Sequence, residues 1–309
     1  MQRPYIRLFL PDGENPYQLL QAENAAASAD RLALTLDVDF ADGDFGLQIR
    51  QIVQATRQEV ERPDVVMVMP VQETALKSLS EETVRSGCGW VYLNRTAGNV
   101  GTLRQVDRKV PTGYVAPDQR EIGRVHARIL RSLFAGRSAH VVYLQGRATT
   151  SSAQERRAGF VEGIQSPGPR IEIAGVLDGN WTARDADAAM TRWLQLAIPA
   201  KIHIDAVVCQ SDFMASGVQA ALTAAAERFN NPALGALPVI GCDGMTSVGK
   251  RLVDQGRLAA TVVVPSTADK ALAAVIGHRN GTIMPEEILL LPRAYPDESV
   301  LERQARHSA

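Results

Sequence analysis

Short, continuous apolar runs alternate with longer amphipathic segments along the whole chain. The runs have the length and composition of buried β-strands, and the segments between them have the length and spacing of helices. Helices are predicted at 18–30, 47–60, 120–134 and 212–229. Strands are predicted at 5–10, 32–38, 64–70, 90–94, 113–117, 140–146, 171–177, 205–211, 237–243 and 258–264.

Strands that are apolar on both faces are typical of parallel sheets covered by helices on each side, which predicts a doubly wound α/β fold. About ten strands are too many for one such sheet, so we expect two similar parallel-sheet lobes with a ligand cleft between them. The lobe boundary falls near 114–119, where no Gly/Ser-rich linker occurs, and this favours short hinges. The predicted N-terminal lobe takes 1–116 and 265–291, and the C-terminal lobe takes 117–264 and 292–309.

Composition narrows the function classes. The chain has 309 residues, 45% of them hydrophobic, and a net charge of −1 with both signs interspersed. This balance gives no basic surface for nucleic acid, and no apolar run is long enough for membrane insertion. Cys88, Cys209 and Cys242 lie in or beside apolar runs without metal-ligand spacing, so we expect them in the core. No export signal opens the sequence, so we expect a cytosolic protein or a signal outside this chain.

Polar and aromatic side chains recur where predicted strands end, which is where open α/β sheets bind ligands. Amides, carboxylates and guanidinium groups together suit a neutral polyhydroxylated ligand, because each hydroxyl both donates and accepts. Tyr17 and Trp181 offer flat faces for a sugar ring. The first strand lacks G-x-G-x-x-G, so Asn15 and Tyr17 would approach a small ligand with side chains rather than bring backbone to a diphosphate.

Seven motifs stand in one order: the turn Asn15-Pro16-Tyr17, the strand end Asn94-Arg95, then SSAQERRAGF, GNW, QSDFMASGV, VIGCDG and GRLAATV. In this order the chain resembles the type I periplasmic binding proteins, specifically the ribose-binding group, whose fold is shared with the effector domain of LacI-type repressors. The resemblance covers nearly the whole chain. It implies a protein that closes on a small sugar or polyol by hinge motion.

Position by position, the resemblance implies eight ligand-binding residues. The first lobe would contribute Asn15, Tyr17, Asn94 and Arg95, and the second Arg156, Trp181, Ser211 and Asp243. Several positions depart from the family pattern. Gln18 replaces a second aromatic residue, Asn94 a common aspartate, Ser211 a common asparagine and Val264 a common glutamine. A ribose-like specificity is therefore open, with a pentose, deoxy sugar or other polyol as alternatives.

Structural roles compete with these assignments. Asn15 and Asp243 both precede a predicted helix and are suited to cap it, with Pro16 at the favoured first position. Arg95 and Arg156 would be ordinary solvated charges if they lay on the surface, and Trp181 would be a loop aromatic closing over the core. Arg157 is expected in solvent.

No catalytic set is visible, and no cofactor or metal site is predicted. The five histidines are scattered, without an adjacent nucleophile or a second histidine at helical metal-ligand spacing. The segment 244–251, GMTSVGKR, has P-loop spacing, but Arg251 stands where the motif needs Ser or Thr.

The sequence therefore predicts a non-enzymatic solute-binding protein for ABC-type uptake or sensing, with an ABC permease or a sensor as its partner. The resemblance implies a periplasmic location. One alternative is a cytosolic sugar-sensing effector domain acting through a partner protein. Another is a doubly wound enzyme acting on a small hydroxylated substrate.

Overall fold

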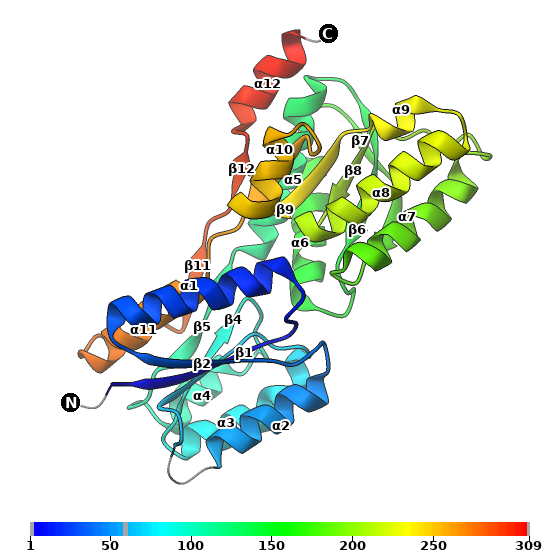
Figure 1. The fold of residues 1–309 in the computed structure, drawn as a ribbon. Helices are drawn as coiled ribbons and strands as arrows, with labels where there is room; N and C mark the ends of the chain where they lie inside the picture. Colours follow the sequence, from blue (N-terminus) through cyan, green and yellow to red (C-terminus); the bar gives the residue numbers. More distant parts are fainter. Residues whose placement is uncertain (1–2, 58–60, 308–309) are drawn as a thin grey trace. The chain divides into compact units, whose positions relative to one another are not determined.

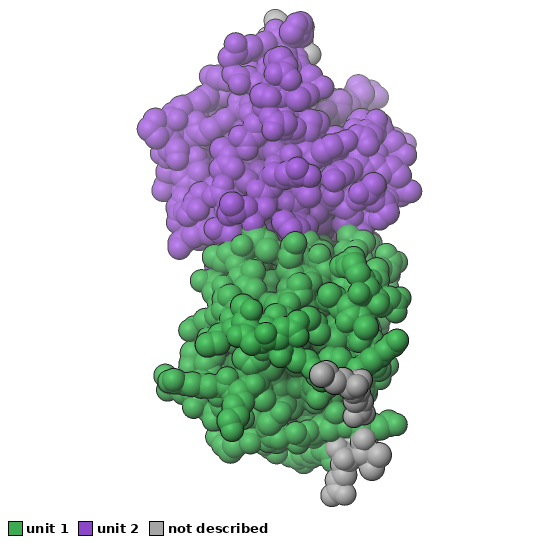
Figure 2. Space-filling model, turned by 90° about the vertical axis from the view of Figure 1, so that its left-hand side faces the viewer, with its two compact units in different colours: residues 1–117, 266–290 green, residues 118–265, 291–309 purple. Residues whose placement is uncertain are grey.

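The computed structural model describes residues 3–57 and 61–307, which fall into two compact units, coloured separately in Figure 2. Unit 1 comprises Met1–Pro117 and Ser266–Leu290, and unit 2 comprises Asp118–Pro265 and Leu291–Ala309. The chain thus passes between the units at three points. No helix of the described ranges combines the length and hydropathy that crossing a bilayer requires.

Unit 1 is built on a six-stranded sheet in which every neighbouring pair of strands is parallel. The strand order is β11-β5-β4-β3-β1-β2. The central strand β3 is buried along its whole length and reads VVMV, because helices cover both faces of the sheet. The strands are β1 (Tyr5–Leu10), β2 (Thr35–Phe40), β3 (Val65–Val68), β4 (Gly89–Leu93), β5 (Thr112–Pro117) and β11 (Glu287–Leu290).

The helices of unit 1 form two layers. α1 (Pro16–Leu32) and α11 (Ala268–Arg279) lie side by side on one face of the sheet (Figure 1). The other face carries α2 (Phe45–Thr56), α3 (Lys77–Arg85), preceded by the 3-10 turn η1 (Glu73–Leu76), and α4 (Val100–Val106).

Unit 2 repeats this architecture, with strand order β12-β10-β9-β8-β6-β7. Its pairs are parallel except that β12 runs antiparallel to β10. The four-residue strand β8 is fully buried, as β3 is in unit 1. The strands are β6 (Ala139–Gln145), β7 (Ile171–Asp178), β8 (Ala206–Cys209), β9 (Val239–Asp243), β10 (Ala260–Val263) and β12 (Arg293–Tyr295).

Two helix pairs cover the unit-2 sheet. From β6 the chain crosses to the neighbouring strand β7, and from β7 it crosses back past β6 to β8. Because such connections are right-handed, crossovers in opposite directions place α6 and α7 on opposite faces of the sheet. α6 packs on α5 so closely that a Cβ at Gly159 would lie 1.8 Å from the carbonyl oxygen of Arg120. The helices are α5 (Gln119–Phe134), α6 (Ser151–Gln165), α7 (Ala183–Ala197), α8 (Asp212–Arg228), α9 (Pro232–Gly235), the π turn η2 (Thr246–Lys250), α10 (Arg251–Asp254) and α12 (Glu298–His307).

The predicted α/β fold with parallel sheets is confirmed, with two corrections to the elements. The strand predicted at 32–38 was placed too early, because α1 continues through Leu32 and β2 begins at Thr35. The prediction missed β11 and β12. The helix predicted at 47–60 is α2, and the last three residues of that prediction, 58–60, lie outside the described residues.

Candidate ligand-binding site

Each predicted site residue lies at the carboxyl end of its sheet or on the helix that follows. In unit 1, Asn15 and Tyr17 follow β1, and Asn94 and Arg95 follow β4. In unit 2 the four residues lie at or after the ends of four different strands. They are Arg156 on α6 after β6, Trp181 after β7, Ser211 after β8 and Asp243 as the last residue of β9. We call these the unit-1 set and the unit-2 set.

The unit-1 set is joined by hydrogen bonds. Asn15 caps α1, and its Oδ1 accepts the backbone N–H of Tyr17 at 3.0 Å. The Tyr17 hydroxyl donates to Asn94 Oδ1 at 3.1 Å, which connects the loops after β1 and β4. Asn15 and Asn94 are each 7% exposed. A buried phenol and two buried amides therefore form one fixed array of donors and acceptors.

Local backbone geometry positions Asn94 and Arg95. Asn94 has φ +64°, in the left-handed region that asparagine tolerates better than most residues. This turn directs the chain away from β4 at its end. Arg95 is half-buried, and its NH1 donates to the carbonyl oxygen of Pro70, just beyond β3, at 3.0 Å. Arg95 is therefore not an ordinary solvated arginine, the structural alternative to its predicted ligand-binding role, because it joins two neighbouring strand ends.

Arg156 is the centre of the unit-2 set. Its side chain is inside the unit, since the residue is only 3% exposed. Nε donates to Gln119 Oε1 at 2.7 Å, and NH1 donates to the Gln210 carbonyl oxygen at 2.6 Å and lies 3.5 Å from Cys242 Sγ. A buried guanidinium held in this way is fixed in orientation. Its neighbour Arg157 is exposed.

Trp181 lies against this guanidinium, whose carbon is 5.5 Å from the centre of the indole ring. The ring also packs on the end of the β6 strand: a Cβ at Gly146 would lie 2.0 Å from the indole, so only glycine fits there. Asn180 and Trp181 both have left-handed backbone, with φ +48° and +68°. Such geometry is unfavourable for tryptophan, which indicates that the loop is held in this shape by its contacts.

Ser211 and Asp243 lie at the ends of β8 and β9. Ser211 caps α8, its Oγ accepting the backbone N–H of Met214 at 3.1 Å. Asp243 has φ +111°. Among the described residues, no side chain caps η2, the turn that follows β9. Burial raises the pKa of Asp243 to about 7, against the opposing effect of the positive Arg156.

Asp212 is a second buried carboxyl beside Asp243. Its Oδ2 accepts the backbone N–H of Gly244 at 2.8 Å, and its Oδ1 accepts the Thr261 hydroxyl at 2.7 Å. Burial first, and then the nearby Asp243 carboxylate, raise the pKa of Asp212 well above its usual value. Asp212 thus fixes the backbone of the loop that carries Asp243.

Sequence reasoning missed three residues that position the unit-2 set: Gln119, Gln210 and Asp212. Gln210 Oε1 accepts the N–H of Gly146, while its Nε2 donates to the Tyr143 hydroxyl, each at 2.9 Å. The segment QSD, 210–212, contained a signal, since three polar residues directly follow an apolar strand. Only the middle one was singled out.

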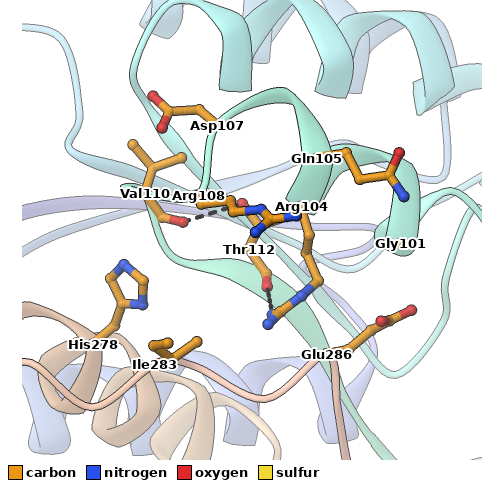
Figure 3. A pocket seen from close by; sticks show the side chains of 10 residues that line it. All are labelled: Gly101, Arg104, Gln105, Asp107, Arg108, Val110, Thr112, His278, Ile283 and Glu286. Carbon is orange, nitrogen blue, oxygen red and sulfur yellow. Dashed lines mark hydrogen bonds between the residues drawn. The ribbon is translucent and has the colours of Figure 1, made fainter.

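A separate cavity of about 380 Å³ lies in unit 1 at the amino end of β5 (Figure 3). Arg104 forms one wall, and its NH1 donates to the carbonyl oxygens of Thr112 and Met284 at 2.8 and 2.7 Å. None of the eight predicted residues lines it. It is distinct from the unit-1 set, which lies at the carboxyl end of the same sheet.

Two doubly wound parallel sheets, each with polar and aromatic side chains at its carboxyl edge, define a two-lobed solute-binding protein. A family model described as periplasmic binding protein domain matches residues 6–279, and the chain belongs to this family. The predicted resemblance is thereby confirmed. Because members of the family bind solutes without transforming them, the chain is a binding protein rather than an enzyme.

Individual relatives agree with the family. The chain is 26% identical over 266 residues to the D-ribose/D-allose-binding protein of Pseudomonas aeruginosa, covering 84% of this chain and 76% of that one. The Caulobacter myo-inositol binding protein, solved with myo-inositol, superposes with a TM-score of 0.79 at 22% identity, covering 98% and 97% of the two chains. An ABC transporter periplasmic solute binding protein from Actinobacillus succinogenes with bound D-allose gives a TM-score of 0.80 at 19% identity, covering 97% and 100%.

Proposed function

We propose that this chain binds a small sugar or cyclic polyol in the periplasm and delivers it to an ABC-type permease. The unit-1 and unit-2 sets hold the same ligand molecule in this proposal. A conformation in which both sets contact the ligand gains the interactions of both, so ligand binding shifts the conformational equilibrium toward it. That ligand-bound conformation is the signal for the permease.

The observation that carries this proposal is the Arg156–Trp181 pair. A planar guanidinium fixed next to an indole suits a ring with adjacent hydroxyls, because the guanidinium donates two parallel hydrogen bonds and the indole packs on C–H groups. The unit-1 set adds neutral donors and acceptors from Tyr17 and Asn94. Tyr17 and Asn94 carry no charge, so this pair suits hydroxyl groups rather than a charged group, and Arg95 supplies the charge of the unit-1 set.

Relatives support the substrate class. The proteins named above are described as binding D-ribose, D-allose and myo-inositol, which are all small rings with several hydroxyls. The family's periplasmic description supports the location, and the ABC transporter description of the Actinobacillus protein supports the permease partner.

A thermal-shift screen tests this proposal. The panel contains D-ribose, D-allose, myo-inositol and other pentoses and polyols. A ligand at a hundredfold excess over its Kd stabilises the native state by about 2.7 kcal/mol. The cognate compound should therefore raise Tm by several degrees, and it should be recovered unchanged after incubation. The Arg157→Ala variant, altered in an exposed neighbour, is the control and should show the same shift. A panel that leaves Tm unchanged throughout contradicts the proposed ligand class, and conversion of the compound contradicts the binding role.

A further inference from the structure

Two histidines and an aspartate meet at the amino edge of the unit-2 sheet, opposite the carboxyl edge that carries the unit-2 set. His140 is the second residue of β6, and His203 and Asp205 lie in the connection from α7 to β8. β6 and β8 are neighbouring parallel strands, so their amino ends lie next to each other. The fold therefore brings together residues separated by more than sixty positions.

The donor atoms of these three side chains converge. His203 Nε2 lies 2.8 Å from Asp205 Oδ1, and His140 Nδ1 lies 3.5 Å from Asp205 Oδ2. The two imidazole rings are 5.6 Å apart, edge to face, and all the donor atoms fall within 4.8 Å of one another. The backbone N–H of His140 also donates to Asp205 Oδ2 at 2.7 Å, which holds the carboxylate between the two rings.

We propose that His140, His203 and Asp205 form a binding site for a divalent transition-metal cation of the zinc class. Zinc bonds to imidazole nitrogen and carboxylate oxygen are about 2.0–2.2 Å long, so tetrahedral ligand atoms lie about 3.3 Å apart. The observed separations reach this geometry through small side-chain rotations. Two imidazoles favour zinc, nickel or copper over magnesium and calcium, which prefer oxygen ligands.

Exposure gives the cation access and leaves room for water as a fourth ligand. The side chain of His203 is 69% exposed and that of His140 43% exposed, whereas Asp205 is 24% exposed. A bound cation would connect the start of β6 to the segment before β8. It would therefore stabilise unit 2 from the edge that lies away from the proposed sugar-binding residues.

Zinc titration of the full chain tests this site. ZnCl2 at a hundredfold excess over its Kd should raise Tm by roughly 5–10 °C, whereas MgCl2 should leave Tm unchanged. Calorimetry should give one zinc per chain. The His203→Ala variant alters an exposed loop residue and should fold normally, but it should bind zinc at least tenfold more weakly. The His307→Ala variant, which removes an exposed histidine of α12, should bind zinc as the unaltered chain does.

Cobalt provides a second readout that does not depend on stability. CoCl2 should give the visible absorption of a low-symmetry four-coordinate site, and His203→Ala and Asp205→Asn should each abolish it. Zinc affinity that is unchanged in His203→Ala overturns the proposal, as does zinc binding only at millimolar concentration. A zinc-dependent stabilisation equal in His203→Ala and His307→Ala also overturns it. The Tm shifts measured with sugars and polyols do not depend on any of these zinc and cobalt results.

Discussion

Units 1 and 2 share one topology but build their candidate binding sets from different chemistry. In the unit-1 set, the neutral side chains of Asn15, Tyr17 and Asn94 are held by a helix cap, a left-handed turn and a hydrogen bond. The charged member of this set, Arg95, is only half-buried and donates to the Pro70 carbonyl oxygen. The unit-2 set relies on buried charge, with Arg156 inside the unit and the carboxyl group of Asp243 near it. The same fold can therefore hold hydroxyl-binding side chains in place either by local backbone geometry or by interactions among buried charged groups.

This difference changes what each set is sensitive to. A buried charge is expensive unless hydrogen bonds and opposite charge compensate it, so removal of one member affects the others. Neutral groups fixed by local backbone carry smaller and more independent contributions. Unit 2 should therefore respond strongly to substitution and pH, and unit 1 weakly.

The largest effect is expected from Arg156→Ala. It removes the hydrogen bonds to Gln119 Oε1 and the Gln210 carbonyl oxygen and the positive charge beside Asp243. The free energy of unfolding should fall by about 3 kcal/mol, measured by urea denaturation. The control Arg157→Ala removes an exposed arginine and should change it by less than about 0.5 kcal/mol. Equal effects of the two variants would remove the buried-charge account of unit 2.

A pH dependence is the second prediction. The folded-state pKa of Asp243 is raised above its unfolded value near 4, so the folded state holds a proton that the unfolded state has lost between about pH 4 and 7. The contribution of Asp243 to stability is therefore favourable at the acid end of this window and is lost as pH rises through it.

The variant Asp243→Asn tests this contribution, because asparagine is neutral at every pH and tolerates unusual backbone. From pH 5 to pH 8 its stability relative to the unaltered chain should increase by about 2 kcal/mol, measured by chemical denaturation at each pH. The comparison cancels titrating groups whose pKa does not depend on Asp243, such as His126, whose pKa burial lowers to about 4. The pKa of Asp212 falls when the Asp243 charge is removed, so the variant reports on the carboxyl pair. Parallel stability curves for the two proteins would show that Asp243 does not titrate in this way.

The third prediction concerns the turn at Asn94 in unit 1. Asn94→Gly and Asn94→Ala both remove the acceptor of the Tyr17 hydroxyl, but only alanine is strained at φ +64°. Asn94→Ala should be less stable than Asn94→Gly by about 1 kcal/mol in urea denaturation. Equal stability of the two would show that backbone geometry does not hold this set.

A similarly small effect is expected from Tyr17→Phe. This variant removes one neutral buried hydrogen bond and keeps the ring, so unfolding free energy should fall by about 1 kcal/mol. The result should not vary between pH 5 and 8. A loss as large as that of Arg156→Ala would erase the predicted contrast between the units.

The sequence predicted the buried strands well, because a strand covered on both faces is marked by a continuous apolar run. It failed where that physical condition is absent. β11 reads EILL with alternating exposure, and β12 is a three-residue edge strand that is at most half-buried. The start of β2 was predicted too early, because Leu32 and Leu34 are equally compatible with the end of a helix and with a strand. In the structure α1 ends at Leu32, and Ala33 caps it in a left-handed conformation.

The site shows the same division. Residues at strand ends were identifiable from their position, since the fold places them at one edge. The partners that fix them were not, because Gln119 and Gln210 reach Arg156 only through tertiary packing across 37 and 54 positions of sequence. The His140–Asp205–His203 cluster is likewise invisible until β6 and β8 pair.

Calorimetric titration of the cognate sugar or polyol into Arg95→Ala and Arg156→Lys tests the central proposal most directly, because each variant alters one set. Arg156→Lys keeps the buried charge while losing the planar fork. The account predicts one ligand per chain and an affinity at least tenfold weaker in each variant. Two ligands per chain, or an affinity that responds to the variant of one unit alone, would contradict it.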